Sequence, residues 1–346
     1  MVKHRRLGSV LVAMLALALV SAACGSDDNG SGDTGATGSG DLSGSITISG
    51  SSTVEPISSV VAEEFNAENP DVAISVDGPG TGDGFELFCK GEIDIADASR
   101  PIEDDEAKAC KKNGIDYTEL EVGLDGVTVM TNPENADVSC LNFGDLYALF
   151  GPESDGIDTW NGADALAAQV GGNGGFPDAP LEITAPGEES GTYDAFIELS
   201  GIEDTAIAQG VPEDDAAALR NDYQPSPNDN VIITAMEGTP SALGFVGFAF
   251  AEQAGDQIKE IQVDGGDGCV EPSADTISNG SYPLSRSLYI YVSADAMARP
   301  EVKAYVDFYV TDDSLAADGL LTQVGYIALP ADRIEATRST WESASA

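Results

Sequence analysis

The sequence predicts an α/β protein of two lobes with a ligand cleft between them. From about residue 45, short apolar strands alternate with helical segments, a rhythm typical of parallel α/β sheets. About 300 residues follow the N-terminal region, which is long for one core and suits two. Two strong strands, 126–130 and 288–292, stand where the chain can pass from one lobe to the other and return, so we expect two crossing strands at a hinge.

The first lobe repeats a pattern of strand, elbow and helix. Its expected elements are the alternating strand 45–49, a helix with apolar spacing over 57–65, the strand 72–76, a short helix over 85–90, a buried strand at 93–96 and a polar helix over 103–112. Open α/β sheets bind ligands outside the carboxyl ends of their strands, where these elbows lie. The elbows of this lobe therefore face the expected cleft.

The second lobe continues the same rhythm. Its expected segments are 141–150, a Gly/Asn/Pro-rich loop over 151–180, the strand 181–184, a helix opened by Ser190-Gly191-Thr192, and the segments 243–250 and 258–263. The strand 288–292 returns, and 302–310 packs back on the first lobe. We expect lobe one to comprise 43–126 and 288–346, and lobe two 127–287.

The N-terminus predicts export. A basic start and an apolar run over 10–20, too short to span a membrane comfortably, precede Ser21-Ala22-Ala23-Cys24. This run is similar to a bacterial lipobox, although Ser21 stands where an aliphatic residue is usual. We expect residues 1–23 to be a lipoprotein signal peptide, Cys24 to be lipidated, and 24–42 to be a flexible Gly/Ser/Asp tether to the extracytoplasmic face of the cell membrane. Plain secretion, with Cys24 an ordinary thiol, is the alternative.

The residue inventory limits the chemistry. The only His, His4, lies in the signal peptide, so Ser-His-Asp and Cys-His catalysis and His-ligated metal sites are excluded for the mature protein. Carboxylate pairs and Ser-Lys dyads need no His, so an enzyme is disfavoured without being excluded. We expect no enzyme activity, no cofactor and no metal.

The charge balance argues against two classes of partner. Sixty acidic residues face 15 basic ones, for a formal net charge of -45, which argues against nucleic acid and anionic lipid headgroups. The acids are scattered along the chain, as on a strongly solvated surface. Whether they are an adaptation to salt is left open by the sequence.

Four cysteines remain after Cys24: Cys89, Cys110, Cys140 and Cys269. Their spacings fit no CxxC metal pattern, and export favours disulfides. Of the three connectivities, we favour Cys89–Cys110 and Cys140–Cys269, because each pair then lies within one expected lobe. Free thiols are the alternative.

Four elbows place small hydroxyl and Gly residues where a helix begins. They are Gly50-Ser51-Ser52-Thr53-Val54, Gly80-Thr81-Gly82, Ser99-Arg100 and Ser190-Gly191-Thr192. Helix starts leave backbone N–H groups unpaired and carry partial positive charge, so each can bind an anion. Ordinary capping explains any one of them. Together they predict a pocket for a small tetrahedral oxyanion.

Two charged positions refine this prediction. Arg100 is one of only twelve basic residues outside the signal peptide, and a guanidinium can grip two oxygens of a phosphate, so we expect it to be the sole cation of the site. A structural pair with Asp97 or Glu103 is the alternative. Glu188 and Glu189 precede the fourth elbow, and a carboxylate there can accept the hydrogen of HPO4 while repelling sulfate. Solvated charge in a first helical turn is the alternative for both.

An ordered set of motifs supports this interpretation. The chain contains, in order, ISGSSTVEPI, DGPGTGDGF, DIADASRPI, PGEESGTYDAF, GTPSALGFVGFAFAE and YPLSRSLYIYV, and over about 43–346 it resembles PstS-type phosphate-binding lipoproteins of ABC transporters. The resemblance implies a two-lobed periplasmic-binding-protein fold that closes on inorganic phosphate and delivers it to a membrane permease. We expect the protein to be a monomer.

The resemblance also implies a ligand set. The corresponding groups are Ser52, Thr53, the Val54 backbone N–H, Thr81, Ser99, Ser190, Gly191 and Thr192. Two positions depart from the family pattern: Pro186 stands where members carry an Arg, and Arg100 where they carry an Asp. We expect a charge exchange across the cleft, with Arg100 on lobe one and Glu189 or Glu188 as the acid on lobe two. A binding protein for another oxyanion, or a phosphate-ester hydrolase, is the rival interpretation.

Overall fold

The computed structural model describes residues 42–346, so the expected signal peptide, Cys24 and most of the tether lie outside the described residues. The first lobe is built from β1 (Gly44–Gly50), α1 (Glu55–Glu68), β2 (Val72–Asp77), α2 (Thr81–Lys90), β3 (Ile95–Ala98) and α3 (Asp104–Asn113). Each strand runs into a helix through one of the short elbows, as the sequence predicts. The C-terminal segment completes this lobe with α12 (Ala294–Met297), α13 (Pro300–Tyr309), α14 (Asp312–Leu315), α15 (Leu320–Gln323) and α16 (Ala331–Ala344).

The second lobe holds the middle of the chain. Its helices are α4 (Phe143–Phe150), α5 (Asp164–Val170), α6 (Gly191–Ser200), α7 (Ile202–Gln209), α8 (Glu213–Ala216), α9 (Asp229–Gly238), α10 (Phe248–Ala254) and α11 (Ala274–Ser278). Its strands are β5 (Cys140–Asn142), β6 (Glu182–Ala185), β7 (Gln224–Pro225), β8 (Ala242–Gly247), β9 (Lys259–Glu260), β10 (Gln262–Asp264) and β11 (Cys269–Val270). The expected segment 243–250 comprises most of β8 and the start of α10, because β8 ends at Gly247 and α10 begins at Phe248.

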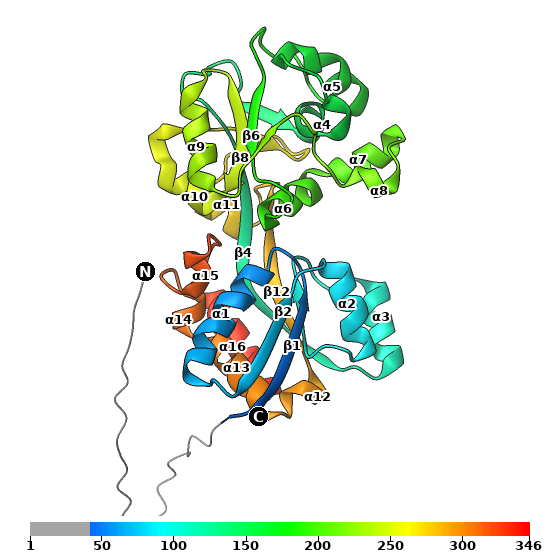
Figure 1. The fold of residues 1–346 in the computed structure, drawn as a ribbon, viewed down its shortest axis with the longest axis vertical. Coiled ribbons are helices and arrows are strands. Elements are labelled where there is room, and N and C mark those ends of the chain that lie inside the picture. The colour runs from blue at the N-terminus through cyan, green and yellow to red at the C-terminus, as the bar shows by residue number, and fades with distance from the viewer. Residues whose placement is uncertain (1–41) are drawn as a thin grey trace, which may run out of the picture. The chain divides into compact units, whose positions relative to one another are not determined.

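One sheet runs through both lobes in the order β2-β1-β3-β12-β4-β8-β6-β7. Within it β1 is parallel to β2 and β3, and β6 is parallel to β7 and β8. Figure 1 shows the helices of each lobe arranged around its own part of the sheet. The expected two-lobed α/β fold is therefore confirmed.

Two strands join the lobes. β4 (Tyr117–Thr131) is fifteen residues long, so its first half belongs to lobe one and its second half pairs with β8 in lobe two. β12 (Ser285–Ser293) runs antiparallel to it, with Arg286 opposite Asp125. Figure 1 shows both strands passing between the lobes. The returning strand begins three residues earlier than the sequence predicts, and Arg286 is thereby placed at the hinge.

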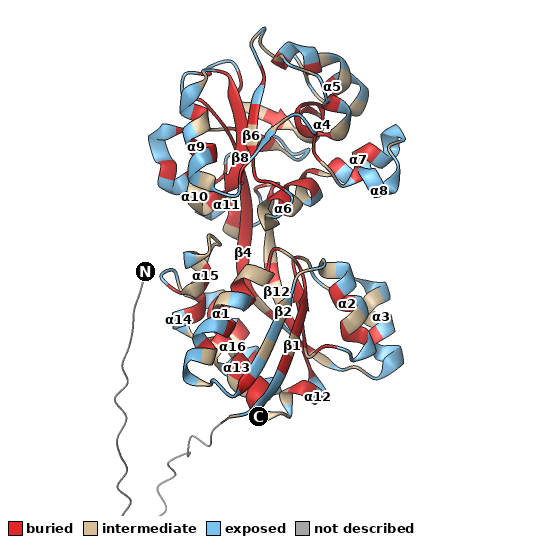
Figure 2. Cartoon of the chain, viewed as in Figure 1, coloured by how far each residue is buried: buried red, intermediate tan, exposed pale blue. Residues whose placement is uncertain are grey.

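Each lobe has its own aromatic core. In lobe one, Phe85 packs edge-on against Tyr291 with ring centroids 4.9 Å apart. In lobe two, Phe196 stacks on Phe245 at 4.0 Å, and Phe150 meets both rings edge-on. Figure 2 shows buried residues along β4 and β8 and exposed residues on the outward faces of the helices. Burial of this apolar surface is the main force that holds each lobe together.

Two disulfides close loops within the lobes. Cys89–Cys110 ties α2 to α3, with Cα atoms 4.1 Å apart. Cys140–Cys269 joins β5 to β11 across 129 residues, with Cα atoms 6.0 Å apart. These are the two pairs that lobe membership predicts.

The acidic surface leads to a prediction about salt. In residues 42–346 only a minority of the carboxylates lies in an ion pair, so most of the negative charge is uncompensated at short range. Between 0.01 and 0.1 M salt the Debye length falls from about 30 to about 10 Å, which weakens repulsion between carboxylates. We expect NaCl over this range to raise the thermal midpoint by several degrees at pH 7, measured by calorimetry without phosphate.

The same salt series at pH 4 provides the control. Many carboxylates approach protonation there, so the salt effect should shrink. A midpoint that stays constant with salt at pH 7 would mean that the carboxylates lie too far apart to destabilise the fold.

Candidate functional site

The first elbow is held in place by the neighbouring strand. Gly50 has a φ of 146°, and a Cβ there would lie 2.1 Å from the Asp97 carbonyl oxygen, so only glycine allows this approach of β1 to β3. The Ser51 N–H donates to the same Asp97 oxygen at 2.9 Å. The Val54 N–H donates to the Ser51 carbonyl at 3.1 Å, and Val54 is fully buried. Of the groups expected to bind an anion here, the Val54 N–H therefore already has a partner within the elbow.

The second and third elbows bond to each other. The hydroxyls of Thr81 and Ser99 are 2.9 Å apart, and the Ser99 N–H donates to Thr81 Oγ1 at 3.2 Å. Gly80, with a φ of 124°, donates its N–H to the Gly50 carbonyl at 2.8 Å. The three elbows of lobe one thus form one polar surface at the ends of β1, β2 and β3.

This surface lines a cavity of about 430 Å³ between the lobes. Lobe one supplies Ser51, Ser52, Thr53, Gly78, Pro79, Gly80, Thr81, Gly82, Ser99 and Arg100, and lobe two supplies Asp194, Ile197, Glu198, Glu203 and Ala217. Five predicted site residues therefore meet here: Ser52, Thr53, Thr81, Ser99 and Arg100.

The fourth elbow meets the first across the cleft. Ser190 caps α6 by accepting a hydrogen bond from the Thr192 N–H at 3.2 Å. Thr53 Oγ1 lies 3.4 Å from the Gly191 carbonyl, and a Cβ on Gly191 would come within 3.0 Å of Thr53 Cα. The start of α6 therefore touches the Thr53 elbow directly, although neither Ser190 nor Thr192 lines the 430 Å³ cavity.

Glu188 and Glu189 lie at a neighbouring cavity. That cavity also measures about 430 Å³ and is lined by Ser52, Glu55, Pro56, Ser59, Gly78, Glu188, Glu189, Gly191 and Asp194. Both Glu side chains are exposed. The carboxylates expected to face the anion therefore stand at a second opening, beside the surface of hydroxyls.

Asp194 is an acid of the site that is not predicted from the sequence. Ser52 Oγ donates to Asp194 Oδ2 at 2.5 Å across the lobes, and Asp194 lines both cavities. Burial raises the pKa of Asp194, while the Ser52 hydrogen bond and the charge of Arg286 oppose the rise. The sequence feature that could have identified Asp194 is its position in the first turn of α6, three residues after Gly191.

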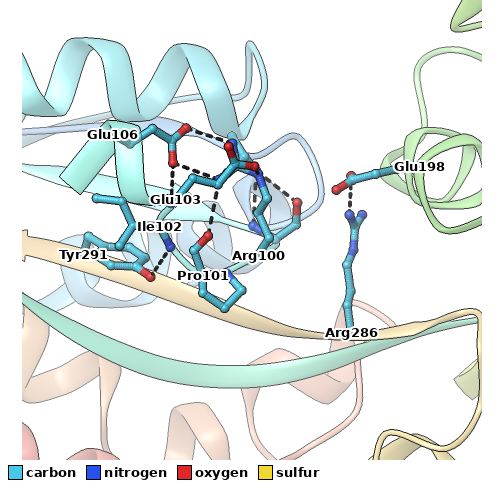
Figure 3. Close-up of polar contacts among 10 residues, drawn as sticks. Arg100, Pro101, Ile102, Glu103, Glu106, Glu198, Arg286 and Tyr291 are labelled. Atoms are coloured by element: carbon cyan, nitrogen blue, oxygen red, sulfur yellow. Dashed lines mark hydrogen bonds and ion pairs between the residues drawn. The ribbon is translucent and has the colours of Figure 1, made fainter. Parts of the chain in front are cut away.

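Arg100 lines the cavity but is committed to partners of its own lobe. Its Nη1 and Nη2 donate to the two oxygens of Glu106 at 2.9 and 2.8 Å, and Glu103 lies 3.5 Å from its Nε (Figure 3). Its guanidinium carbon lies 5.6 Å from the centre of the Phe85 ring. The alternative predicted from the sequence, a structural pair, is therefore present: Glu103 is one of the two predicted partners, and Glu106 takes the place of Asp97.

Arg286 is a second guanidinium beside the cleft, so Arg100 is not the sole cation there. Its Nη1 pairs with Glu198 (Figure 3). Its Nη2 donates to Thr53 Oγ1 at 2.9 Å, and its Nε lies 3.5 Å from Asp125 Oδ2. Only 7% of its side chain is exposed. Arg286 lies in the YPLSRSLYIYV run, which carries part of the family resemblance and contains the predicted strand 288–292, but no site role is predicted for it from the sequence.

Asp97 lies buried directly behind the first elbow. Ser58 Oγ donates to its Oδ1 at 2.9 Å, whereas its Oδ2 has no hydrogen-bond partner. Burial raises the pKa of Asp97 to about 8, and the nearby charge of Glu55 adds to the rise. The carboxyl is therefore mainly protonated at neutral pH and adds little negative charge beneath the site.

A cleft between two α/β lobes, crossed by β4 and β12 and lined by helix starts from both sides, defines a two-lobed solute-binding protein. Residues 35–313 match the profile of the PBP superfamily domain. The chain belongs to this superfamily and, within it, to the family of PstS-type phosphate-binding proteins.

Two curated relatives support the family. The protein SphX of Synechococcus elongatus is 37% identical over 301 residues, which are 86% of this chain and 81% of the relative. The phosphate-binding protein PstS of Staphylococcus epidermidis is 33% identical over 319 residues, which are 92% of this chain and 87% of the relative. The similarity therefore spans nearly the whole chain.

Two solved structures are similar over both lobes. A possible phosphate-binding protein from Planctomyces limnophilus matches with a TM-score of 0.77 and 34% identity, covering 88% of this chain and 99% of that one. An ABC-type phosphate transport receptor from Vibrio cholerae matches with a TM-score of 0.57 and 27% identity, covering 82% and 100%. The chain thus matches nearly the full length of both solved structures.

Proposed function

We propose that this protein binds inorganic phosphate outside the cytoplasm and delivers it to the permease of an ABC transporter. The observation that carries the proposal is the cavity in which three hydroxyl-bearing elbows of lobe one face α6 of lobe two. Hydroxyls and helix-start N–H groups bind a tetrahedral oxyanion well. The family membership and the names of the relatives agree with this ligand.

The ligand groups come from both lobes. We propose that Ser52, Thr53, Thr81, Ser99 and Arg100 bind phosphate from lobe one, with the Val54 N–H if its elbow opens, and that Ser190, Gly191 and Thr192 bind it from lobe two. A bound anion then bridges 43–126 and 288–346 with 127–287 and favours closure about β4 and β12. The ligand thereby selects the closed state.

Asp194 is the best-placed acceptor for the proton of HPO4. It projects from the first turn of α6 and lines both cavities, including the one lined by Thr81, Ser99 and Arg100, whereas Glu189 lines only the neighbouring cavity. A carboxylate that accepts this hydrogen bond would repel fully ionised sulfate. We therefore propose Asp194 as the acid that selects phosphate, in the role for which the sequence predicted Glu189 or Glu188.

Titration calorimetry with phosphate and with sulfate tests the proposed function. On protein freed of phosphate by dialysis against a phosphate-consuming enzyme, we expect phosphate to bind with a Kd below about 1 μM, or roughly -8 kcal/mol. Sulfate should give no measurable heat at the same concentrations. The absence of phosphate heat, or equal affinity for the two anions, would contradict the proposal.

We further propose that the protein performs no reaction on phosphate. Its relatives bear the names of binding and transport proteins. A phosphate-ester hydrolase is the rival with the same ligand chemistry, and a chromogenic phosphate ester separates the two. Release of the chromophore at a rate proportional to protein concentration would favour the hydrolase.

The proposed location rests on the N-terminal sequence. We propose that residues 1–23 are removed, that Cys24 carries the lipid and that 24–42 tether a monomeric body to the outer face of the cell membrane. Within 42–346, none of the helices has the length and apolar character needed to cross a bilayer. In this proposal the lipid holds the protein beside its permease.

A further inference from the structure

Arg286 touches three separate parts of the molecule. It stands on β12 opposite Asp125 of β4, at the point where the two strands join the lobes. From there its guanidinium contacts Asp125 at the hinge, Thr53 in the first elbow of lobe one and Glu198 on α6 of lobe two. A change at one contact therefore affects both lobes.

Asp125, the buried partner of Arg286, leaves part of the guanidinium's positive charge uncompensated. Asp125 and Arg286 are each only 7% exposed, yet Asp125 Oδ2 and Arg286 Nε have no hydrogen bond and are 3.5 Å apart. A guanidinium carries five N–H donors, and a buried one needs close anionic or hydroxyl partners for them. Arg286 is thus able to hold a second anion on its Nη1 and Nη2 side, where Thr53 already lies.

Glu198 now occupies that side. Its carboxylate pairs with Arg286 Nη1, and its side chain is 50% exposed and lines the 430 Å³ cavity. Figure 3 shows Glu198 reaching from α6 to the end of the Arg286 side chain. A half-exposed Glu gains little from such a pair, and rotation into solvent costs it little. Its departure would open Arg286 to the cavity.

Arg100 cannot release its carboxylate partner as readily as Arg286 can release Glu198. Both of its terminal nitrogens bond to Glu106, and Glu106 Oε2 also accepts the Glu103 N–H at 2.8 Å as part of the cap of α3. Removing Glu106 from Arg100 would therefore also disturb the start of a helix. Arg286 is the guanidinium whose outer partner can leave without such a cost.

We propose that Arg286 is an anion-binding residue of the cleft and that Glu198 is an internal carboxylate which the ligand must displace from it. This inference rests on the proposed function and identifies two residues that set its affinity. An anion bonded to the Thr53 hydroxyl lies within reach of Arg286 Nη2, since those two atoms are 2.9 Å apart. Displacing Glu198 also breaks a contact from α6 to the hinge, so binding is coupled to movement of lobe two.

Glu198→Gln tests the competition. The amide keeps the size of the side chain and removes its charge, so inorganic phosphate should bind about tenfold or more tightly in calorimetry. Asp204→Asn, an exposed acid in the first turn of α7 that lines neither cavity, removes one charge from the same lobe and should change the affinity less than about twofold.

Arg286→Gln combined with Asp125→Asn tests the cation. The double variant removes both charges of the buried pair together and so avoids leaving Asp125 unpaired. Circular dichroism should show an intact fold, and phosphate affinity should fall by about 100-fold or more. Adding Glu198→Gln to this background should give no further gain, because its competitor for Arg286 is gone.

The outcomes separate the inference from the proposed function. If the wild-type protein gives no phosphate heat, both are overturned. If it binds phosphate while Glu198→Gln and Asp204→Asn behave alike, or while the folded double variant binds within a few-fold of wild type, the inference alone is overturned. A gain confined to Glu198→Gln that disappears in the double variant supports it.

Discussion

Asp97→Asn is expected to raise the free energy of unfolding by roughly 3 to 5 kcal/mol at pH 8 and to change it little at pH 4. Asp97 is fully buried, and burial raises its pKa from an ordinary value of 3.8 to about 8. Its neighbours offer no compensating cation: Ser58 donates one hydrogen bond, and Glu55, Tyr305 and Tyr309 face it with a carboxylate and two hydroxyls. An asparagine has no charge to bury.

The direction in which the free energy of unfolding changes with pH follows from proton binding to Asp97. Between pH 4 and pH 8 the unfolded chain has released the Asp97 proton while the folded chain still holds it, so rising pH favours unfolding by about 1.4 kcal/mol per unit through this group. Above pH 8 both states are ionised and the cost stays constant. The part of the free energy of unfolding that depends on the Asp97 proton is therefore fully present below pH 4, and it is lost as the pH rises through about 8.

Denaturant unfolding at pH 4, 6 and 8 measures this effect. The difference between Asp97→Asn and wild type should grow with pH. In contrast, Asp71→Asn changes an exposed acid immediately before β2, and its effect should stay within about 0.5 kcal/mol throughout. A difference that is the same at all three pH values would mean that Asp97 does not hold its proton in the folded state.

Gly191→Val is expected to lower phosphate affinity by about 100-fold or more while each lobe stays folded. A Cβ on Gly191 would lie 3.0 Å from Thr53 Cα and 3.1 Å from the Ser52 carbonyl oxygen, and valine adds two further methyl groups. Both contacts cross the cleft, so the lobes can relieve them only by opening about the hinge. The free energy needed to close the lobes against these contacts is then subtracted from the free energy of phosphate binding, so the affinity falls.

Calorimetry and small-angle X-ray scattering together test this prediction. Phosphate should reduce the radius of gyration of the wild type and leave that of Gly191→Val larger. Gly238→Val is the matched control: Gly238 is the last residue of α9, and the added Cβ meets no atom within 4 Å apart from its chain neighbours and the nearby backbone of its own helix. This variant should bind phosphate normally. Near-normal affinity in Gly191→Val would show that the close approach of α6 to the Thr53 elbow is not needed for binding.

The elbows could be predicted from the sequence because the residues that form each one are close neighbours along the chain. Alternating strands, Gly50 and Gly80 at positive φ, and small hydroxyl residues before α1, α2 and α6 lie within a few residues of one another. Parallel strands bring such elbows to one edge of a sheet. The meeting of Ser52, Thr53, Thr81 and Ser99 at one cavity follows from that rule.

The charged groups of the site could not be predicted in the same way. Ser52 and Asp194 are 142 residues apart, and Thr53 and Arg286 are 233 apart. The sequence offered several acids near α6, and only the direction of the side chain from the first helical turn separates Asp194 from Glu189. Arg286 lies outside the predicted strand 288–292, and its partner Asp125 stands on another strand, so the sequence alone does not bring the two charges together.

The sequence by itself determined the α/β rhythm, the pairing of the cysteines within lobes and the elbows, since backbone geometry depends on neighbouring residues. Only the tertiary structure decided which charges face the cleft. Arg100 turned to Glu106 within its own lobe, and Arg286 reached Thr53 and Glu198 from the hinge. Long side chains choose partners by distance in space, and that distance is set by how β4 and β12 bring the two lobes together.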